Sequence, residues 1–478
     1  MVPIRVKDVV RATGGRLLCG DAECLVTEVV TDSRQVKEGS LFVPIIGERV
    51  DAHCFIPDVM KAGAAASFTS EDARATERGA CIYVDDTLAA LQKLAGWYRR
   101  QFDIPVIGVT GSVGKTTTKE MISAVLETKY RVLKTAGNLN SQIGVALMMF
   151  HIDEQTELAV FEMGISMPGE MSRLVEIARP QTAVMTNIGV SHIGNLGSRA
   201  AIAFEKGHIV KYVGDGYGRG EGKGKLYVCG NGDLQQLSKE NIPFGDAVCG
   251  DCSSLSDEIV FYGTEEGCRV MATDLCVTGQ GQRFRYCGEG GCEVHLSVMG
   301  AHHVCNALVA LALGEQFGVE LDAAAEALRC YRPFTMRGER KDYHGYHVID
   351  DTYNASPDSI NSNIDALFDY GETGRRIVVL GDVLELGEQR ESLHRGIGDF
   401  ILAEAEKGKK LYAVITVGEG AAFIAEQVKA HSDMLVETCA GTEEAAQLVR
   451  QLARPGDWIL VKGSRGMHMD EVVEKVVM

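Results

Sequence analysis

Short apolar runs alternate with amphipathic stretches through most of this chain. In its centre, three apolar runs of strand length cover residues 106–110, 158–163 and 182–188. The stretches between and after them carry apolar residues at helical spacing, at 119–127, 170–178 and 200–210. Strands that alternate with helices indicate βαβ units around a parallel sheet, and the ligands of such sheets gather at the carboxyl ends of the strands. We therefore predict an α/β fold with its functional residues at that edge.

The same pattern predicts three domains. Residues 1–97 alternate apolar runs with turns and end in a helical stretch, which indicates a small α/β domain. Residues 98–330 hold the βαβ pattern of a central domain with a parallel sheet, and residues 331–478 alternate strands and helices like a Rossmann-like α/β domain. A chain of 478 residues exceeds the usual size of one compact core, so several domains are expected.

Two segments of the central domain depart from the βαβ pattern. Residues 256–300 alternate apolar and polar side chains with period two between glycine turns, which predicts antiparallel strands. Residues 214–225 are rich in glycine and charge. We interpret this second segment as a surface excursion, with a functional lid as the alternative.

The charge balance argues against two classes of partner. The formal net charge is −18, whereas proteins that bind nucleic acids or anionic membranes present dense lysine and arginine. No apolar run is long enough to cross a bilayer, and the first residues lack the order of a secretory signal. We expect a cytoplasmic monomer that binds neither nucleic acid nor membrane.

The 14 cysteines are scattered over the chain, and most are expected to be reduced thiols. Cys249 and Cys252 form a CxxC pair of the kind that holds zinc. No second CxxC and no paired histidine completes a set of four ligands, so zinc is kept only as an alternative.

One segment, 106–120, carries the most specific chemistry. An apolar strand leads into a helix through a loop that consists of Gly111, Ser112, Val113, Gly114, Lys115, Thr116 and Thr117. The glycines let backbone N–H groups approach phosphate oxygens, Lys115 reaches the β- and γ-phosphates, and the Thr116 hydroxyl can hold Mg²⁺. The loop has the shorter GxxGKT form, because the first glycine of a standard P-loop would fall at Val109. We predict a nucleoside triphosphate site, with a chance match as the alternative.

Three ionisable residues of the central domain are candidates for the same site. Glu162 ends the run 158–163, His192 follows the run 182–188, and Lys206 lies in an apolar helical stretch. Adjacent parallel strands would bring Glu162 and His192 beside the phosphates, where both side chains suit Mg²⁺ or its surroundings. A solvated or capping residue is the alternative for Glu162 and His192, and a surface amine is the alternative for Lys206.

Several motifs together resemble the Mur ligases, ATP-dependent enzymes of peptidoglycan synthesis. They are the GxxGKTTTKE loop, the FEMG strand end, the NIGxxHIxxxGS segment, DDTYNASPDSI, GDVLELGE and VKGSRGMHM, and they extend over nearly the whole chain. The GxxGKT loop alone is shared with the wider family that includes folylpolyglutamate synthase. The DDxYNAxPxS and GDxxELG stretches are similar to those of the member that adds D-alanyl-D-alanine.

The resemblance implies that the three domains bind, in order, a UDP-linked precursor, ATP and the incoming dipeptide. It implies substrate contacts for Ser33, Arg34, Arg49, Asn138, Asn140, Ser141, Tyr353, Asn354, Lys462, Ser464 and Arg465. From the residue types alone, other interpretations stay open: solvated arginines in the first domain, and ordinary turns around the asparagines and the C-terminal residues.

The resemblance also implies the groups that handle ATP. It adds Asn306, Arg337 and Asp351 to the ATP contacts of the loop, assigns Mg²⁺ to Thr116, Glu162, His192 and Lys206, and gives catalytic roles to Lys115, His192, Lys206 and Arg337. Lys206 matches a lysine that these ligases carbamylate, which turns a cation into a carbamate that can hold Mg²⁺. Alternatives are a solvent-facing helix residue for Asn306, and an interdomain ion pair or a turn for Arg337 and Asp351.

The chain departs from the family pattern at three positions. His303 stands where asparagine is usual, Ser356 where asparagine is frequent, and His208 where an acidic residue is usual. The surroundings of Lys206 therefore differ from those in the family.

The reaction implied by the resemblance joins D-alanyl-D-alanine to UDP-N-acetylmuramoyl-tripeptide through an acyl phosphate made with ATP. The third domain is expected to close over the second and to bring Asp351 towards Arg337. Three alternatives stay open: another amide ligase of the family, a nucleotide-dependent switch, and a substrate-binding protein without activity. The chain has no NKxD motif, which argues against a GTPase.

Overall fold

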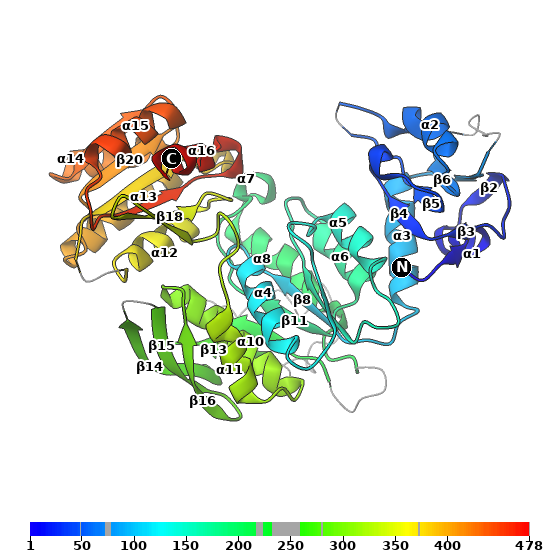
Figure 1. The fold of residues 1–478 in the computed structure, drawn as a ribbon, viewed down its shortest axis with the longest axis horizontal. Coiled ribbons are helices and arrows are strands. Elements are labelled where there is room, and N and C mark those ends of the chain that lie inside the picture. Colours follow the sequence, from blue (N-terminus) through cyan, green and yellow to red (C-terminus); the bar gives the residue numbers. More distant parts are fainter. Residues whose placement is uncertain are drawn as a thin grey trace.

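The computed structural model describes residues 1–47, 49–71, 78–216, 223–231, 259–278, 281–370 and 373–477. Its larger sheets belong to three α/β domains, with the N-terminal domain (blue) and the C-terminal domain (orange to red) on opposite sides of the central one (Figure 1). The predicted three-domain α/β architecture is confirmed. Cys249 and Cys252 lie outside the described residues, as do residues 217–222 of the glycine-rich segment.

The N-terminal domain is built on a five-stranded sheet. In spatial order its strands are β2 (Arg16–Cys19), β7 (Ala80–Tyr83), β6 (Ala66–Thr69), β5 (Ser40–Phe42) and β4 (Glu28–Val30). All neighbours pair in parallel except β2 and β7. The other elements are the β1–β3 ribbon (Ile4–Arg5, Leu25–Val26), helices α1 (Val6–Thr13) and α2 (Ile56–Lys61), and the 3-10 turns η1 (Ser33–Gln35) and η2 (Ala52–Phe55).

Helix α3 (Thr87–Arg99) joins the first two domains. It begins where the Asp86 carboxylate accepts a hydrogen bond from the Ala89 N–H. Its apolar face packs against α1 and against two helices of the central domain, α5 (Gln142–Met149) and α6 (Glu170–Ala178). The helix that was expected to close the first domain is therefore also part of the interface with the second.

The central sheet has nine strands. The strand that precedes the predicted phosphate loop, residues 111–117, lies in its interior and not at its edge. The order is β16 (Gly291–Leu296), β15 (Gly281–Cys287), β14 (Val270–Thr278), β13 (Ile259–Gly263), β12 (Leu226–Cys229), β11 (Thr182–Met185), β8 (Val106–Thr110), β10 (Leu158–Glu162) and β9 (Val132–Lys134). Strands β8 to β14 pair in parallel, whereas β14, β15 and β16 pair antiparallel. The expectation of antiparallel strands for residues 256–300 is correct for β14–β16 but wrong for β13. Period two reports which face of a strand is buried and not the direction of its neighbour.

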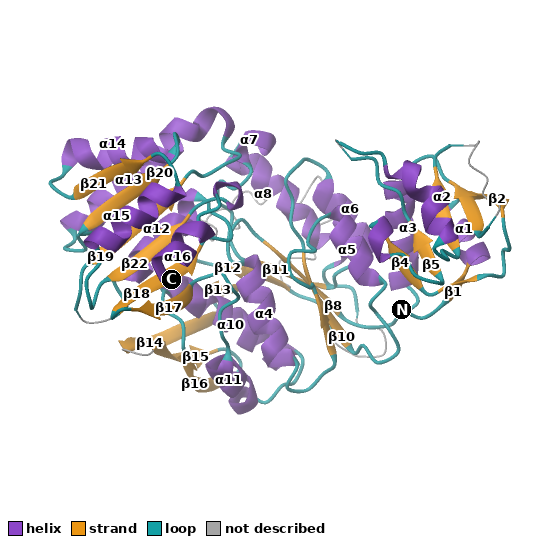
Figure 2. Ribbon diagram, turned by 45° about the horizontal axis from the view of Figure 1, so that its top comes forward, coloured by secondary structure: helices purple, strands orange, loops and turns teal. Residues whose placement is uncertain are grey.

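Helices cover both faces of the central sheet (Figure 2). One buried cluster joins Ile107 and Val109 of β8 to α4 (Lys115–Leu126), α10 (Ala301–Gln316) and α11 (Leu321–Cys330). A second joins Val106 and the β10 residue Phe161 to α5, α6 and α8 (Arg199–Gly207). The short helix α7 (Ile193–Leu196) and the 3-10 turn η3 (His208–Tyr212) flank α8. Burial on both faces explains why β8 is apolar throughout.

The C-terminal domain has six strands. Their order is β17 (Glu339–Tyr343), β18 (Tyr346–Asp351), β22 (Trp458–Lys462), β19 (Arg376–Gly381), β20 (Ala413–Val417) and β21 (Leu435–Cys439), all parallel except β17. Its helices are α12 (Pro357–Leu367), α13 (Arg390–Glu406), α14 (Ala421–His431), α15 (Thr442–Leu452) and α16 (Asp470–Val477), with 3-10 turns η6 (Gly387–Gln389) and η7 (Arg465–Met467). Helices α12–α14 contribute to one buried cluster and α15–α16 to another. Across the described part of the chain, no helix is both long and apolar enough to cross a membrane.

The hydroxyl of Tyr98 ties the start of the chain to the central domain. The side chain is 1% exposed, and its oxygen accepts from the Val2 N–H at 2.8 Å and donates to the Ile152 carbonyl at 2.8 Å. We expect Tyr98→Phe to lower the free energy of unfolding by about 1–3 kcal/mol, because a buried carbonyl loses its partner. Urea unfolding followed by fluorescence measures the change, with Tyr83→Phe as the control. A loss below about 0.5 kcal/mol, typical of a surface substitution, would contradict the expectation.

Candidate active site

The loop between β8 and α4 can form only with glycine at two positions. Gly111 has a φ of +146° and Gly114 a φ of +85°, values that other residues rarely adopt. A Cβ atom on Gly111 would lie 1.9 Å from the Thr186 Oγ1 atom. Gly114 is the N-cap of α4, so the loop wraps around the positive end of that helix.

Asn187, which follows β11, holds this loop in place. Its Oδ1 atom accepts hydrogen bonds from the N–H groups of Ser112 and Val113, at 3.0 and 2.8 Å. The Ser112 hydroxyl in turn accepts from the Gly189 N–H at 2.9 Å. With these two loop N–H groups engaged, binding of an anion at this loop would fall to the first turn of α4. Asn187 is the first residue of the NIGxxHIxxxGS motif, but the motif by itself does not reveal this role.

Two lysine amines meet at one carbonyl oxygen. Lys115 Nζ donates to the Gly111 oxygen at 2.9 Å, and Lys206 Nζ donates to the same oxygen at 3.1 Å. Burial lowers the pKa of Lys115; the Glu162 carboxylate opposes this shift and the Arg337 charge adds to it. Burial, with the charge of Lys115, lowers the pKa of Lys206 well below its usual value. Lys206 is only 1% exposed, so the interpretation as a surface amine is wrong.

Glu162 is a buried carboxylate surrounded by polar donors. It is 2% exposed and accepts from Thr116 Oγ1 at 2.8 Å and from Asn140 Nδ2 at 2.7 Å. Its backbone N–H donates to Thr135 Oγ1 at 2.9 Å. A hydroxyl next to a carboxylate suits Mg²⁺, which takes one or two carboxylates and completes its shell with water and phosphate oxygens. The described residues contain no cluster of three or more histidine, cysteine, aspartate or glutamate side chains that could hold a metal ion.

His192 reaches the same site from the other side. Strands β10 and β11 lie on opposite sides of β8, so the expectation that the strands of Glu162 and His192 are adjacent is wrong. Burial lowers the pKa of His192; the Glu385 carboxylate opposes the shift, and the charges of Lys115 and Lys206 favour it. The Nδ1 atom of His192 contacts the Glu385 carboxylate of the third domain.

Asn306 lies beneath the glycine-rich loop. It is 6% exposed, and its Oδ1 atom accepts from Thr118 Oγ1 of α4 at 2.9 Å. The solvent-facing alternative for Asn306 is therefore wrong. The neighbouring His303 is buried, which lowers its pKa well below the usual value, and its Nδ1 atom has no hydrogen-bond partner among the described residues.

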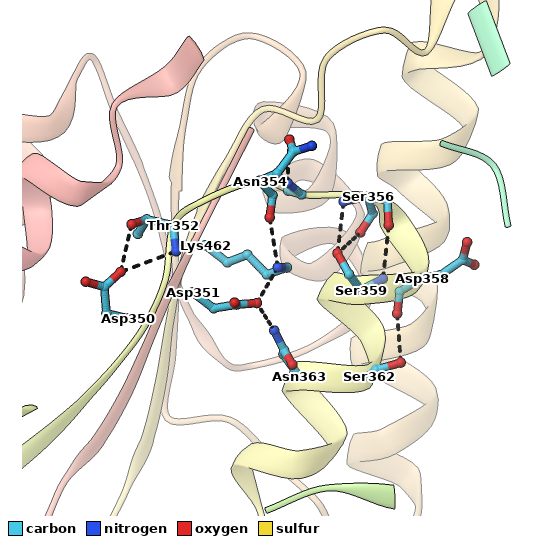
Figure 3. Close-up of polar contacts among 11 residues, drawn as sticks. Asp350, Asp351, Thr352, Asn354, Ser356, Asp358, Ser359, Ser362, Asn363 and Lys462 are labelled. Atoms are coloured by element: carbon cyan, nitrogen blue, oxygen red, sulfur yellow. Dashed lines mark hydrogen bonds and ion pairs between the residues drawn. The ribbon is translucent and has the colours of Figure 1, made fainter. Parts of the chain in front are cut away.

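The third-domain residues predicted for the site fall into two groups. The Arg337 guanidinium lies 3.9 Å from the centre of the Tyr353 ring, and its charge acts on Lys115 as noted above. The Asp351 carboxylate contacts the Lys462 amine and the Asn363 amide, and Lys462 Nζ also donates to the Asn354 carbonyl at 3.0 Å (Figure 3). In this arrangement the partner of Asp351 is Lys462 and not Arg337.

The remaining predicted substrate residues are more dispersed. Ser33, Arg34 and Arg49 belong to the N-terminal domain, where the exposed Arg34 guanidinium pairs with Asp32 and holds the pKa of that carboxyl at about 2. Asn138 is exposed, and Ser141 caps α5 by accepting from the Gly144 N–H at 3.3 Å. Ser464 Oγ accepts from the Leu384 N–H at 2.9 Å, and Arg465 pairs with Asp470 at 3.2 Å.

The sequence of the chain matches three family models. They are the Mur ligase family catalytic domain over residues 25–139, the Mur ligase middle domain over 109–220 and the Mur ligase glutamate ligase domain over 336–465. The chain is also 37% identical to the UDP-N-acetylmuramoyl-tripeptide–D-alanyl-D-alanine ligase of Bacillus subtilis (strain 168), over 100% of this chain and 99% of that relative. It belongs to the Mur ligase family.

Solved structures of Mur ligases have the same architecture as this chain. MurF from Acinetobacter baumannii superposes with a TM-score of 0.85 at 27% identity and covers 99% of both chains. MurF ligase from Thermotoga maritima, solved in complex with ADP, superposes with a TM-score of 0.80 at 27% identity, over 94% of this chain and 96% of that one. The three-domain arrangement of the Mur ligases is thus present along the whole chain.

Burial of Lys206 has a measurable thermodynamic consequence. Because its pKa is lowered in the folded state, the unfolded chain binds more protons, and stability rises with pH up to the unfolded pKa of about 10.4. We expect Lys206→Met to raise the midpoint of thermal unfolding at pH 7 and to flatten its rise towards pH 9. Scanning calorimetry in CO₂-free buffer measures both, with the exposed Lys429→Met as the control. Equal slopes in the wild type and Lys206→Met would contradict the expectation.

Proposed function

We propose that this chain is an ATP-dependent ligase that joins D-alanyl-D-alanine to UDP-N-acetylmuramoyl-tripeptide. The observation that carries the proposal is the full-length identity of 37% to the B. subtilis ligase of that name, in a chain whose P-loop lysine, Glu162 and Lys206 converge. ATP as a substrate agrees with the ADP complex of the T. maritima ligase. The enzyme would form a C–N bond between an acid and the amine of an amino acid or peptide, as a step of peptidoglycan precursor synthesis.

The reaction needs an activated carboxylate, because amide formation from a carboxylate and an amine is uphill in water. The terminal carboxylate of the tripeptide attacks the γ-phosphorus of ATP, ADP leaves, and an acyl phosphate forms. The free amine of D-alanyl-D-alanine then attacks the acyl carbon and displaces inorganic phosphate. Lys115, Arg337 and the N–H groups at the start of α4 stabilise the charge on the transferring phosphoryl group.

We propose that Thr116, Glu162 and a carbamylated Lys206 hold Mg²⁺, with His192 beside them. Two observations support the fit: the oxygens of Thr116 and Glu162 are 2.8 Å apart, and Lys206 lies on the adjoining carbonyl of Gly111. Carbon dioxide reacts with the neutral form of an amine, and the lowered pKa of Lys206 favours that form. When bound, Mg²⁺ neutralises negative charge on the phosphates. His192, whose Nδ1 atom contacts the Glu385 carboxylate, would position a metal ligand or water.

The other site assignments extend the proposal to whole domains. The domain of residues 1–97 would bind the UDP end of the precursor through Ser33, Arg34 and Arg49, and residues 98–330 would bind ATP through the loop and Asn306. Residues 331–478 would bind the dipeptide through Tyr353, Asn354, Lys462, Ser464 and Arg465, with Asp351 moving towards the nucleotide on closure. Asn138, Asn140 and Ser141 would contact the precursor, and the enzyme would work as a cytoplasmic monomer.

Phosphate release tests the reaction. With purified precursor, ATP and D-alanyl-D-alanine, we expect release that depends on both peptide substrates. Precursor labelled with ¹⁸O in the reacting carboxyl group should pass one labelled oxygen to inorganic phosphate. Lys115→Ala should lower kcat by about 100-fold or more, because a group aimed at the transition-state charge is lost, while Lys429→Ala on the exposed face of α14 should not.

The same assay separates two of the alternatives. Unlabelled phosphate released without amide would indicate a nucleotide switch, and faster turnover with a single amino acid than with the dipeptide would indicate another ligase of the family.

A further inference from the structure

Two glycines of the central domain lie against third-domain atoms. A Cβ on Gly189 would lie 2.0 Å from an Asp358 carboxylate oxygen, and a Cβ on Gly194 would lie 2.7 Å from the Gly387 nitrogen and 2.8 Å from the Glu385 carbonyl oxygen. Neither Gly189 nor Gly194 has a positive φ, so their own backbone conformation does not require glycine. For Gly194, the atoms that leave no room for a side chain belong to the third-domain backbone.

Hydrogen bonds cross the boundary at the same places. The Val190 N–H donates to the Asp358 carboxylate at 3.3 Å, and the Gly194 N–H donates to the Glu385 carbonyl at 3.0 Å. Helix α7, which contains Gly194, packs against the 3-10 turn η6, which begins at Gly387. Asp358 lies in the first turn of α12, and its carboxylate points away from the pair of Asp351 and Lys462 (Figure 3).

The central side of this contact is continuous with the phosphate loop. Asn187 Oδ1 accepts from Ser112 and Val113, and the Gly189 N–H donates to the Ser112 hydroxyl. The next residue, Val190, donates to Asp358. Four consecutive residues, 187–190, thus join the loop that surrounds the nucleotide phosphates to a carboxylate of the third domain.

We propose that Gly189, Val190 and Gly194 form an interdomain seat that receives Asp358, Glu385 and Gly387. This seat fixes the third domain in the position from which Arg337 can reach the phosphates of bound ATP. The inference rests on the proposed ligase function and adds to it two positioning residues, Gly194 and Asp358. Neither Gly194 nor Asp358 has a role in the chemical steps, so their contribution is to align the domain that carries Arg337 and the dipeptide residues.

Substitution of Gly194 tests the seat directly. In Gly194→Ala the added methyl group meets third-domain backbone atoms, which cannot rotate away as a side chain would. We expect kcat for ligation to fall about tenfold or more. The Kd for ADP should stay within about twofold of the control, and the midpoint of thermal unfolding within about 2 °C of it. The control is Gly396→Ala, on the exposed face of α13, where a Cβ meets no atom within 4 Å.

A second pair of variants tests the carboxylate. Asp358→Ala removes the acceptor of the Val190 N–H, and we expect kcat to fall about fivefold or more. Asp358→Asn keeps an oxygen in place and should recover most of this loss. A matching loss in both variants would overturn the role given to this hydrogen bond.

Small-angle scattering of the full chain with ADP gives a readout independent of activity. We expect a larger radius of gyration for Gly194→Ala than for the wild type and Gly396→Ala. Turnover within twofold of the control together with an unchanged radius would overturn the proposal, and so would joint loss of ADP binding and thermal stability. An inactive wild type whose radius still differs from that of Gly194→Ala would reject the ligase function and support the seat.

Discussion

The carbonyl oxygen of Gly111 is the point on which the site depends, because two lysine amines donate to it in a region removed from water. Burial lowers the pKa of Lys206 well below its usual value, and the nearby charge of Lys115 adds to this shift. The Glu162 carboxylate balances part of the remaining charge. A triphosphate would bring the anionic charge that suits such a site, which explains why a buried amine and a partly buried amine can lie so close together.

Buried polar contacts extend this site towards the proposed precursor loop. Lys119 of α4 is fully buried and donates to the Thr135 carbonyl at 2.7 Å, while Thr135 Oγ1 accepts from the Glu162 N–H. Asn140, from the same loop, donates to the Glu162 carboxylate. One helix and one strand end therefore fix the phosphate loop and residues 135–140 relative to each other. A substrate carboxylate held by that loop would be presented to the γ-phosphate in a defined position.

Glycine serves two different purposes around the nucleotide. Gly111 and Gly114 are needed for their backbone angles, whereas Gly194 is needed because backbone atoms of the third domain come close to it. The first two glycines shape the loop within one domain, and Gly194 lets another domain approach. The enzyme can thus keep a rigid phosphate site and still depend on the placement of a separate domain for its chemistry.

Local sequence determined the elements, the phosphate loop and the family. The runs at 106–110 and 170–178 coincide with β8 and α6, because apolar spacing records which side chains are buried. Only the tertiary structure decided the partners: β13 runs parallel, His192 meets Glu385 and Asp351 meets Lys462. His192 and Glu385 are 193 positions apart in the sequence, and Asp351 and Lys462 are 111 positions apart. The periodicity of apolar residues carries no information on which distant residue a side chain will meet. The role of Asn187 was hidden for the same reason, since it depends on β11 lying beside β8.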